Sequence, residues 1–194
     1  VRVLRAIRLS EKLGLTIDEH TYINFRNAKH LLINEPKGRL FEEMLKILLS
    51  GNALNVVREL AELNLPRRVF PLFDRLFFHK SHDDFAYKVL EKTDLRIASG
   101  EDVSLVFILA GLIWSAIYQS WQQELKQGVH AKQALMDAIA RNKTVIFNSG
   151  VTRNLYTAMR DMWMLQVEFD APSVATLDHL LNHNRFRQAC HLFT

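Results

Sequence analysis

The sequence predicts an all-α protein of about ten helices with no substantial sheet. Apolar side chains recur at helical spacing along nearly the whole chain, and no convincing alternating pattern is longer than four residues. Only 7 Gly and 4 Pro occur among 194 residues, fewer turn-forming residues than many short strands would need. Because 48% of the residues are hydrophobic and 24% are charged, we expect a packed core rather than disorder.

Glycines and capping residues delimit the helices of the first third of the chain. Gly14 can end the first helix, since glycine readily adopts the left-handed conformation that follows a helix. Asp18 can cap a second helix that runs to about Ile33. Pro36 precedes a third helix, which Gly51 closes. The core positions expected from these helices and from a fourth, capped by Asn52, are Leu4, Ile7, Leu13, Phe41, Met44, Leu45, Leu48, Leu49, Val56, Val57, Leu60 and Leu63.

The second part of the chain is predicted to be helical as well. Phe85 to Ala98 has helical spacing, and Ser104 can cap a long apolar helix that ends near Gly128. Helices are also expected over 131–141 and 152–166, followed by a short one at 172 and a last one capped at 184. The polar stretch 79–84 is the best candidate boundary, so we expect two regions, 1–80 and 81–194.

The longest apolar stretch, Val103 to Tyr118, has 16 residues. A membrane span needs roughly 18 or more, so we interpret this stretch as a buried core helix and expect no membrane association. No signal peptide is visible, and the single Cys excludes an internal disulfide. These features favour a cytoplasmic protein.

The chain lacks the short motifs of several enzyme classes. It contains no phosphate-binding GxxxxGK[ST] or GxGxxG loop and no GxSxG nucleophile turn. His179 and His183 are four residues apart without the Glu of a zinc hydrolase, and His82-Asp83 lacks the partners of a metal phosphohydrolase. The adjacent carboxylates of Glu42-Glu43 point about 100° apart on a helix, so we expect a solvated face and no metal site.

Basic residues are more informative. The chain has 25 Lys and Arg against 21 Asp and Glu, a net charge of +4, which permits an acidic partner. Arg2, Arg5 and Arg8 recur every three residues, and guanidinium groups suit phosphates and base edges because their donors are planar and paired. An ordinary solvated face is the alternative. Trp121, Tyr156 and Trp163 could stack on bases, although aromatic residues at helical spacing are more often core.

The segment VRVLRAIRLSEKLG at residues 1–14 resembles the neck-helix signature of the bacterial poly(A) polymerase and tRNA CCA-adding enzyme family. In that family Glu-Asp-x-x-Arg runs into Arg-Ala-x-Arg-Phe-x-x-x-Leu-Gly. Arg2 matches the final Arg of the first element, and Leu9 replaces the usual Phe. A second segment, PKGRLFEEMLKILLSG at residues 36–51, is more similar to the poly(A) polymerase branch.

The resemblance implies a helical neck over 1–80, containing a nucleotide-base and RNA-binding region, and a helical body with an RNA-binding C-terminal region over 81–194. It also implies a catalytic head that precedes this segment and holds two Mg²⁺ ions and ATP. We therefore expect no catalytic residue in this chain, no activity from it alone, and a monomer that acts on RNA 3′ ends within a polynucleotide adenylyltransferase.

The resemblance also implies roles for individual residues. Arg2 would contact the base edge of ATP, and Arg5 would assist it or position it. Arg8 would contact RNA or pair with Glu43 to hold the first helix on the third. The remaining cations expected to contact RNA phosphates are Lys37, Arg39, Arg153 and Arg160.

Three other functions stay open from the sequence. The chain could be the same region of a CCA-adding enzyme, a helical RNA-binding or protein-interaction module without catalysis, or a metal phosphohydrolase.

Overall fold

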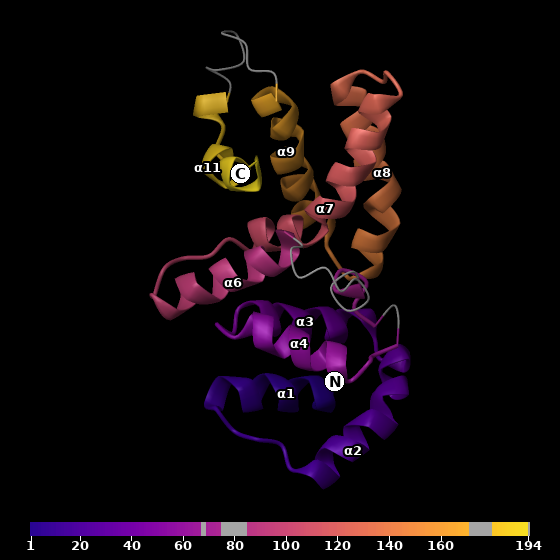
Figure 1. Cartoon of the computed structure of the whole chain (residues 1–194), viewed down its shortest axis with the longest axis vertical. Helices are drawn as coiled ribbons and strands as arrows, with labels where there is room; N and C mark the ends of the chain where they lie inside the picture. The colour runs from indigo at the N-terminus through magenta and orange to yellow at the C-terminus, as the bar shows by residue number, and fades with distance from the viewer. Residues whose placement is uncertain (67–68, 75–84, 171–179, 194) are drawn as a thin grey trace. The chain divides into compact units, whose positions relative to one another are not determined.

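A computed structural model describes residues 1–66, 69–74, 85–170 and 180–193 (Figure 1). Over these residues it contains nine α-helices, one 3-10 helix and no strand, which confirms the predicted all-α class. The elements are α1 (Arg2–Leu13), α2 (Glu19–Ala28), the 3-10 helix η1 (Lys29–Asn34), α3 (Lys37–Leu48), α4 (Ala53–Glu62), α6 (Phe85–Ala98), α7 (Leu105–Lys126), α8 (Ala131–Asn148), α9 (Arg153–Asp170) and α11 (Phe186–Phe193).

The chain divides into two compact units. The first contains residues 1–104 and 148–150, and the second contains residues 105–147 and 151–194. The boundary that we predict after residue 80 lies outside the described residues, as does the short helix expected at residue 172.

The core of the first unit lies between α1, α3 and α4, which pack side by side (Figure 1). Leu4 and Ile7 of α1 are buried, as the spacing predicts, and α1 ends at Gly14 with φ 64°. The same prediction is wrong for Leu13 and Leu49, which are 61% and 44% exposed because they lie at the ends of α1 and α3. α3 contributes Met44, Ile47 and Leu48, and α4 contributes Val56, Val57 and Leu60. In contrast, α2 buries none of its residues. This packing fixes the face of α1 that can reach solvent.

Helix capping in the first unit follows the sequence at one helix and departs from it at another. Asp18 accepts a hydrogen bond from the backbone N–H of Thr21 at the start of α2, as predicted. The side chain of Asn52 makes no such bond at the start of α4, so that prediction is wrong. Asp94 of α6 replaces it, because its two carboxylate oxygens accept from the backbone N–H groups of Ala53 and Leu54 at 2.8 and 2.9 Å.

The second unit is built on α7, which packs against α9 and α11. Among the described helices, α7 alone is long and apolar enough to cross a membrane by length and composition, but it also contributes nine buried residues to this unit. The buried indole of Trp163 on α9 donates to the backbone carbonyl of Ala110 on α7 at 3.3 Å. Gln166 of α9 donates to the carbonyl of Ala189 on α11 at 3.0 Å. These contacts are those of a core helix, as the sequence predicts.

Candidate functional site

The arginine row of α1 is divided by the packing of the helix. Arg2 is exposed and makes no hydrogen bond or ion pair with another described residue. Arg5 is half-exposed at 53%, whereas the side chain of Arg8 is only 15% exposed. The row of three predicted from the spacing therefore presents Arg2 and part of Arg5 to solvent and turns Arg8 inward.

Glu43 on α3 is the centre of a charged cluster that joins α1 to α3. Arg5 donates from Nη2 to Glu43 Oε1 at 2.9 Å, and Lys46 Nζ donates to the same oxygen at 3.1 Å. Arg8 Nε lies 3.9 Å from Glu43 Oε2, beyond hydrogen-bonding distance. The solvated role that we predict for Glu43 is wrong, because the residue is only 2% exposed. Its neighbour Glu42 is exposed.

Two of these cations, Arg5 and Lys46, determine the ionisation of Glu43. Burial alone would raise the pKa of this carboxyl, but the hydrogen bonds from Arg5 and Lys46 and the charges of both outweigh it, so the pKa is lowered. Glu43 is therefore a carboxylate at neutral pH. It neutralises the inward side of the α1 row and leaves the outward side positive.

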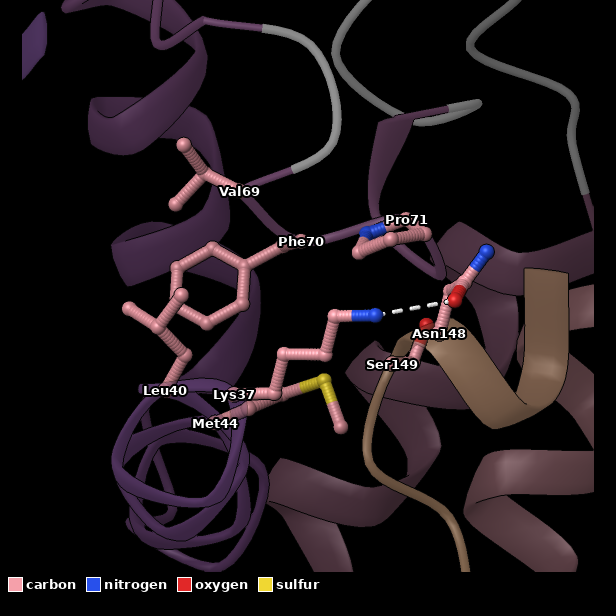
Figure 2. A pocket seen from close by; sticks show the side chains of 8 residues that line it. All are labelled: Lys37, Leu40, Met44, Val69, Phe70, Pro71, Asn148 and Ser149. Carbon is pink, nitrogen blue, oxygen red and sulfur yellow. Dashed lines mark hydrogen bonds between the residues drawn. The ribbon is translucent and has the colours of Figure 1, made fainter. Parts of the chain in front are cut away.

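A second basic location is the start of α3. Figure 2 shows Lys37 extending along a small pocket toward Asn148, to whose Oδ1 its Nζ donates at 2.9 Å. Arg39 is exposed and has no partner among the described residues. α3 begins at Lys37 without a side-chain cap, so no capping side chain accepts from the N–H groups of its first turn. The pocket is lined by Lys37, Leu40, Met44, Val69, Phe70, Pro71, Asn148 and Ser149.

Other cations predicted to bind RNA lie on α9 of the second unit. Arg153 and Arg160 are both exposed, and Arg160 forms an ion pair with Asp161 at 3.5 Å. Of the three aromatic residues that we considered for base stacking, Trp121 and Trp163 are buried. Tyr156 is half-buried and packs against Phe147 of α8. Sequence reasoning missed Phe147, because its partner comes from a different helix.

Metal ligands are not gathered in the part of the chain that the structure describes. No three His, Cys, Asp or Glu residues there form a group that could hold an ion. His82, Asp83 and His179 lie outside the described residues. The ring of His183 accepts a hydrogen bond from the backbone N–H of Arg185 at 3.2 Å.

Two segments of the chain match known families. Residues 14–77 match the family described as the probable RNA and SrmB-binding site of polymerase A. Residues 127–194 match the family described as the polymerase A arginine-rich C-terminus. Poly(A) polymerase I of Escherichia coli O157:H7 is 30% identical over 196 residues, which cover 97% of this chain. This chain belongs to the bacterial poly(A) polymerase family.

Other poly(A) polymerases show similar coverage. The enzyme of Salmonella typhi is 29% identical over 197 residues, and that of Haemophilus influenzae is 28% identical over 195 residues. The chain spans 42% of the length of each of these relatives. Its similarity is therefore to the RNA-binding and arginine-rich regions of the bacterial poly(A) polymerases, as the motifs at residues 1–14 and 36–51 suggest.

The candidate residues of this chain fall in different matched segments. The first range contains Lys37, Arg39 and Glu43, and the second contains Arg153 and Arg160. The arginine row of α1 precedes both ranges. The family therefore associates the two basic locations on α3 and α9 with separate regions of the polymerase.

Proposed function

We propose that this chain is the RNA-binding portion of a template-independent polynucleotide adenylyltransferase, which adds AMP from ATP to RNA 3′ ends. The observation that carries the proposal is the similarity to poly(A) polymerase I over 97% of the chain. Two regions of that similarity contain exposed cations of the kind that contact phosphates. RNA and ATP are its proposed partners, and the cytoplasm is its proposed location.

The basic location at the start of α3 supports the RNA part of the proposal. Lys37 and Arg39 lie in the first turn of α3, where the helix dipole adds partial positive charge. Such a location can bind backbone phosphate without contacting a base, which suits an enzyme that accepts many different 3′ ends. Arg153 and Arg160 supply the same chemistry on the second unit.

Arg2 is proposed to contact the adenine of ATP. It is the exposed guanidinium of the α1 row, and its donors are not occupied by another described residue. Arg5 lies one turn further along and is held by Glu43, so it is proposed to position the helix and to contribute charge beside Arg2. Arg8 faces Glu43 and is proposed to hold α1 on α3 rather than to contact RNA.

We propose that adenylyl transfer by the intact protein uses Mg²⁺. Among the described residues of this chain, no three His, Cys, Asp or Glu residues form a group that could hold an ion. We therefore assign no metal ion and no chemical step to them. Their proposed contribution is to bind RNA, to select the base and to orient both.

The test is nucleotide addition by the intact protein that contains this chain. It is supplied with ATP or CTP, and with either a generic RNA primer or a tRNA that lacks its 3′ end. A long ladder from ATP alone on generic RNA is the expected result. Addition limited to a few C and A residues on tRNA would replace the proposal with CCA addition, and no addition to either RNA would overturn it.

A pair of variants of the intact protein then tests the base contact. Arg2→Ala should lower the preference for ATP over CTP by about tenfold, because a guanidinium bonded to a base edge provides that order of discrimination. Arg58→Ala is the matched control, since Arg58 is an exposed cation of α4 outside the proposed site. Equal ATP preference in the two variants would remove Arg2 from the base contact.

A further inference from the structure

Phe147 of α8 and Tyr156 of α9 form an aromatic pair in the second unit. Their ring centroids are 5.0 Å apart and their planes are tilted by 43°. Both residues are half-buried, so part of each ring reaches solvent. The hydroxyl of Tyr156 forms no hydrogen bond with another described residue. The pair therefore lies at the surface of this unit rather than within its core.

Two buried tryptophans of the same unit, Trp121 and Trp163, have a different environment. Trp121 and Trp163 are at most 2% exposed, and each indole N–H donates to a backbone carbonyl. Aromatic core residues of this kind have their polar atoms satisfied by the protein. Tyr156 lacks such a bond to the described residues, and the residue is only partly buried, so it is not held within the core as the two indoles are.

Each helix that carries the pair also carries cations on the same helix face. Arg153, Tyr156 and Arg160 are spaced by three and four residues on α9, so they share one helix face. Lys143 precedes Phe147 by four residues on α8 and shares its face in the same way. The three cations are exposed, and the only acidic group paired with them among the described residues is Asp161, 3.5 Å from Arg160.

We propose that the Phe147–Tyr156 pair binds an unpaired base of single-stranded RNA by stacking, while Arg153, Arg160 and Lys143 contact the phosphates on either side of it. Stacking platforms flanked by cations are the general means by which proteins hold single strands without reading their sequence. The charge around the pair favours a polyanion over a protein partner. The inference rests on the proposed function, and it deepens that function by assigning a base contact to the second unit.

The experiment compares two RNAs of equal length and equal phosphate number. One is an oligoadenylate, and the other is the same oligoadenylate with several bases removed, which leaves abasic positions. Affinities for the full 194-residue chain are measured by fluorescence anisotropy at one fixed salt concentration. Wild type should bind the abasic RNA more weakly. Tyr156→Leu should bind the oligoadenylate about fivefold or more weakly than wild type does, because one stacked base is lost. The same variant should bind the abasic RNA as wild type does.

Tyr156→Phe is the matched control, since it keeps the ring and removes only the hydroxyl, and it should bind both RNAs nearly as wild type does. Circular dichroism checks that each variant is folded. The comparison of the two RNAs with wild type needs no variant, so equal affinities would still overturn the stacking contact if Tyr156→Leu does not fold.

The outcomes separate this inference from the proposed function. If wild type binds both RNAs equally well, the stacking contact is overturned while RNA binding stands. If Tyr156→Leu is folded and loses no affinity for the oligoadenylate, this pair is not the platform. If wild type binds neither RNA, the RNA-binding proposal fails and the stacking contact fails with it.

Discussion

Replacement of Glu43 by glutamine should destabilise the first unit, because this carboxylate is buried among three cations. Removing one partner of a fully buried ion pair costs about 3–5 kcal/mol. Two of the cations here, Arg5 and Lys46, are at least half-exposed and can turn to water, so their loss contributes little. Arg8 is only 15% exposed and would be left without its counter-charge. We therefore expect a loss of about 2–3 kcal/mol for Glu43→Gln, below the fully buried range.

Urea denaturation followed by circular dichroism at pH 7 measures this loss. Tryptophan fluorescence is unsuitable, since Trp114, Trp121 and Trp163 all lie in the second unit. Glu42→Gln is the matched control, because Glu42 is the adjacent residue on α3 and is exposed. A surface change of that kind should alter the free energy of unfolding by about 0.5 kcal/mol or less. Equal unfolding midpoints for the two variants would refute the reasoning.

The pH dependence gives the same prediction an independent check. The pKa of Glu43 is lowered in the folded chain, so its stabilising contribution is present above the unfolded value of 4.5. The contribution is lost as the pH falls from that value toward the folded pKa. The difference between wild type and Glu43→Gln should therefore be full at pH 7 and should shrink below pH 4.5. A difference that stays constant into acid would show that packing, and not charge, causes it.

Three further predictions concern the first unit. Burial and the nearby carboxylate of Glu11 raise the pKa of Glu59 to about 7, so wild type should lose stability as the pH rises from 4.5 to 7. Above pH 7 Glu59→Gln should therefore unfold at a higher urea concentration than wild type does. Equal urea midpoints at pH 8 would contradict this. Gly150→Ala places a Cβ 2.7 Å from Cβ of Phe41 and should cost about 1–3 kcal/mol. Gly128→Ala in the second unit is the comparison, because Gly128 has a similar positive φ, 83° against 90°, but open space around it. Thermal melts should show the larger loss for Gly150→Ala, and equal losses would contradict the clash with Phe41. Asp94→Ala should cost about 1–2 kcal/mol by removing the cap of α4, and urea midpoints no different from wild type would rule out that cap.

Local signals predicted most of the fold. The end of α1 at Gly14 and the bounds of α6 at Phe85 and Ala98 follow the sequence, because caps, glycines and helical spacing act within a few residues. The cap of α4 could not be predicted in this way. Its acceptor, Asp94, is about 40 residues from the N–H groups that it binds. Only the packing of α6 against α4 brings them together.

The candidate site was predictable in residue type but not in orientation. Spacing placed Arg2, Arg5 and Arg8 on one helix, and the possible pairing of Arg8 with Glu43 was visible. Spacing could not show that Arg5 donates the shorter bond or that Lys46 joins it. The carboxylates of residues 42 and 43 look alike in sequence, and only the approach of α1 buries the second of them.

The net charge of +4 is too small to indicate where an anion would bind, and the structure shows why the total is uninformative. Glu43 neutralises the inward side of the α1 row, so the positive charge that remains at that row is carried by Arg2 and the outer part of Arg5. On α9 only Asp161 opposes Arg160, and Arg153 has no partner among the described residues. A modest excess of cations can therefore give two locally positive surfaces, and at the α1 row this happens because the carboxylate that balances it, Glu43, is buried between α1 and α3.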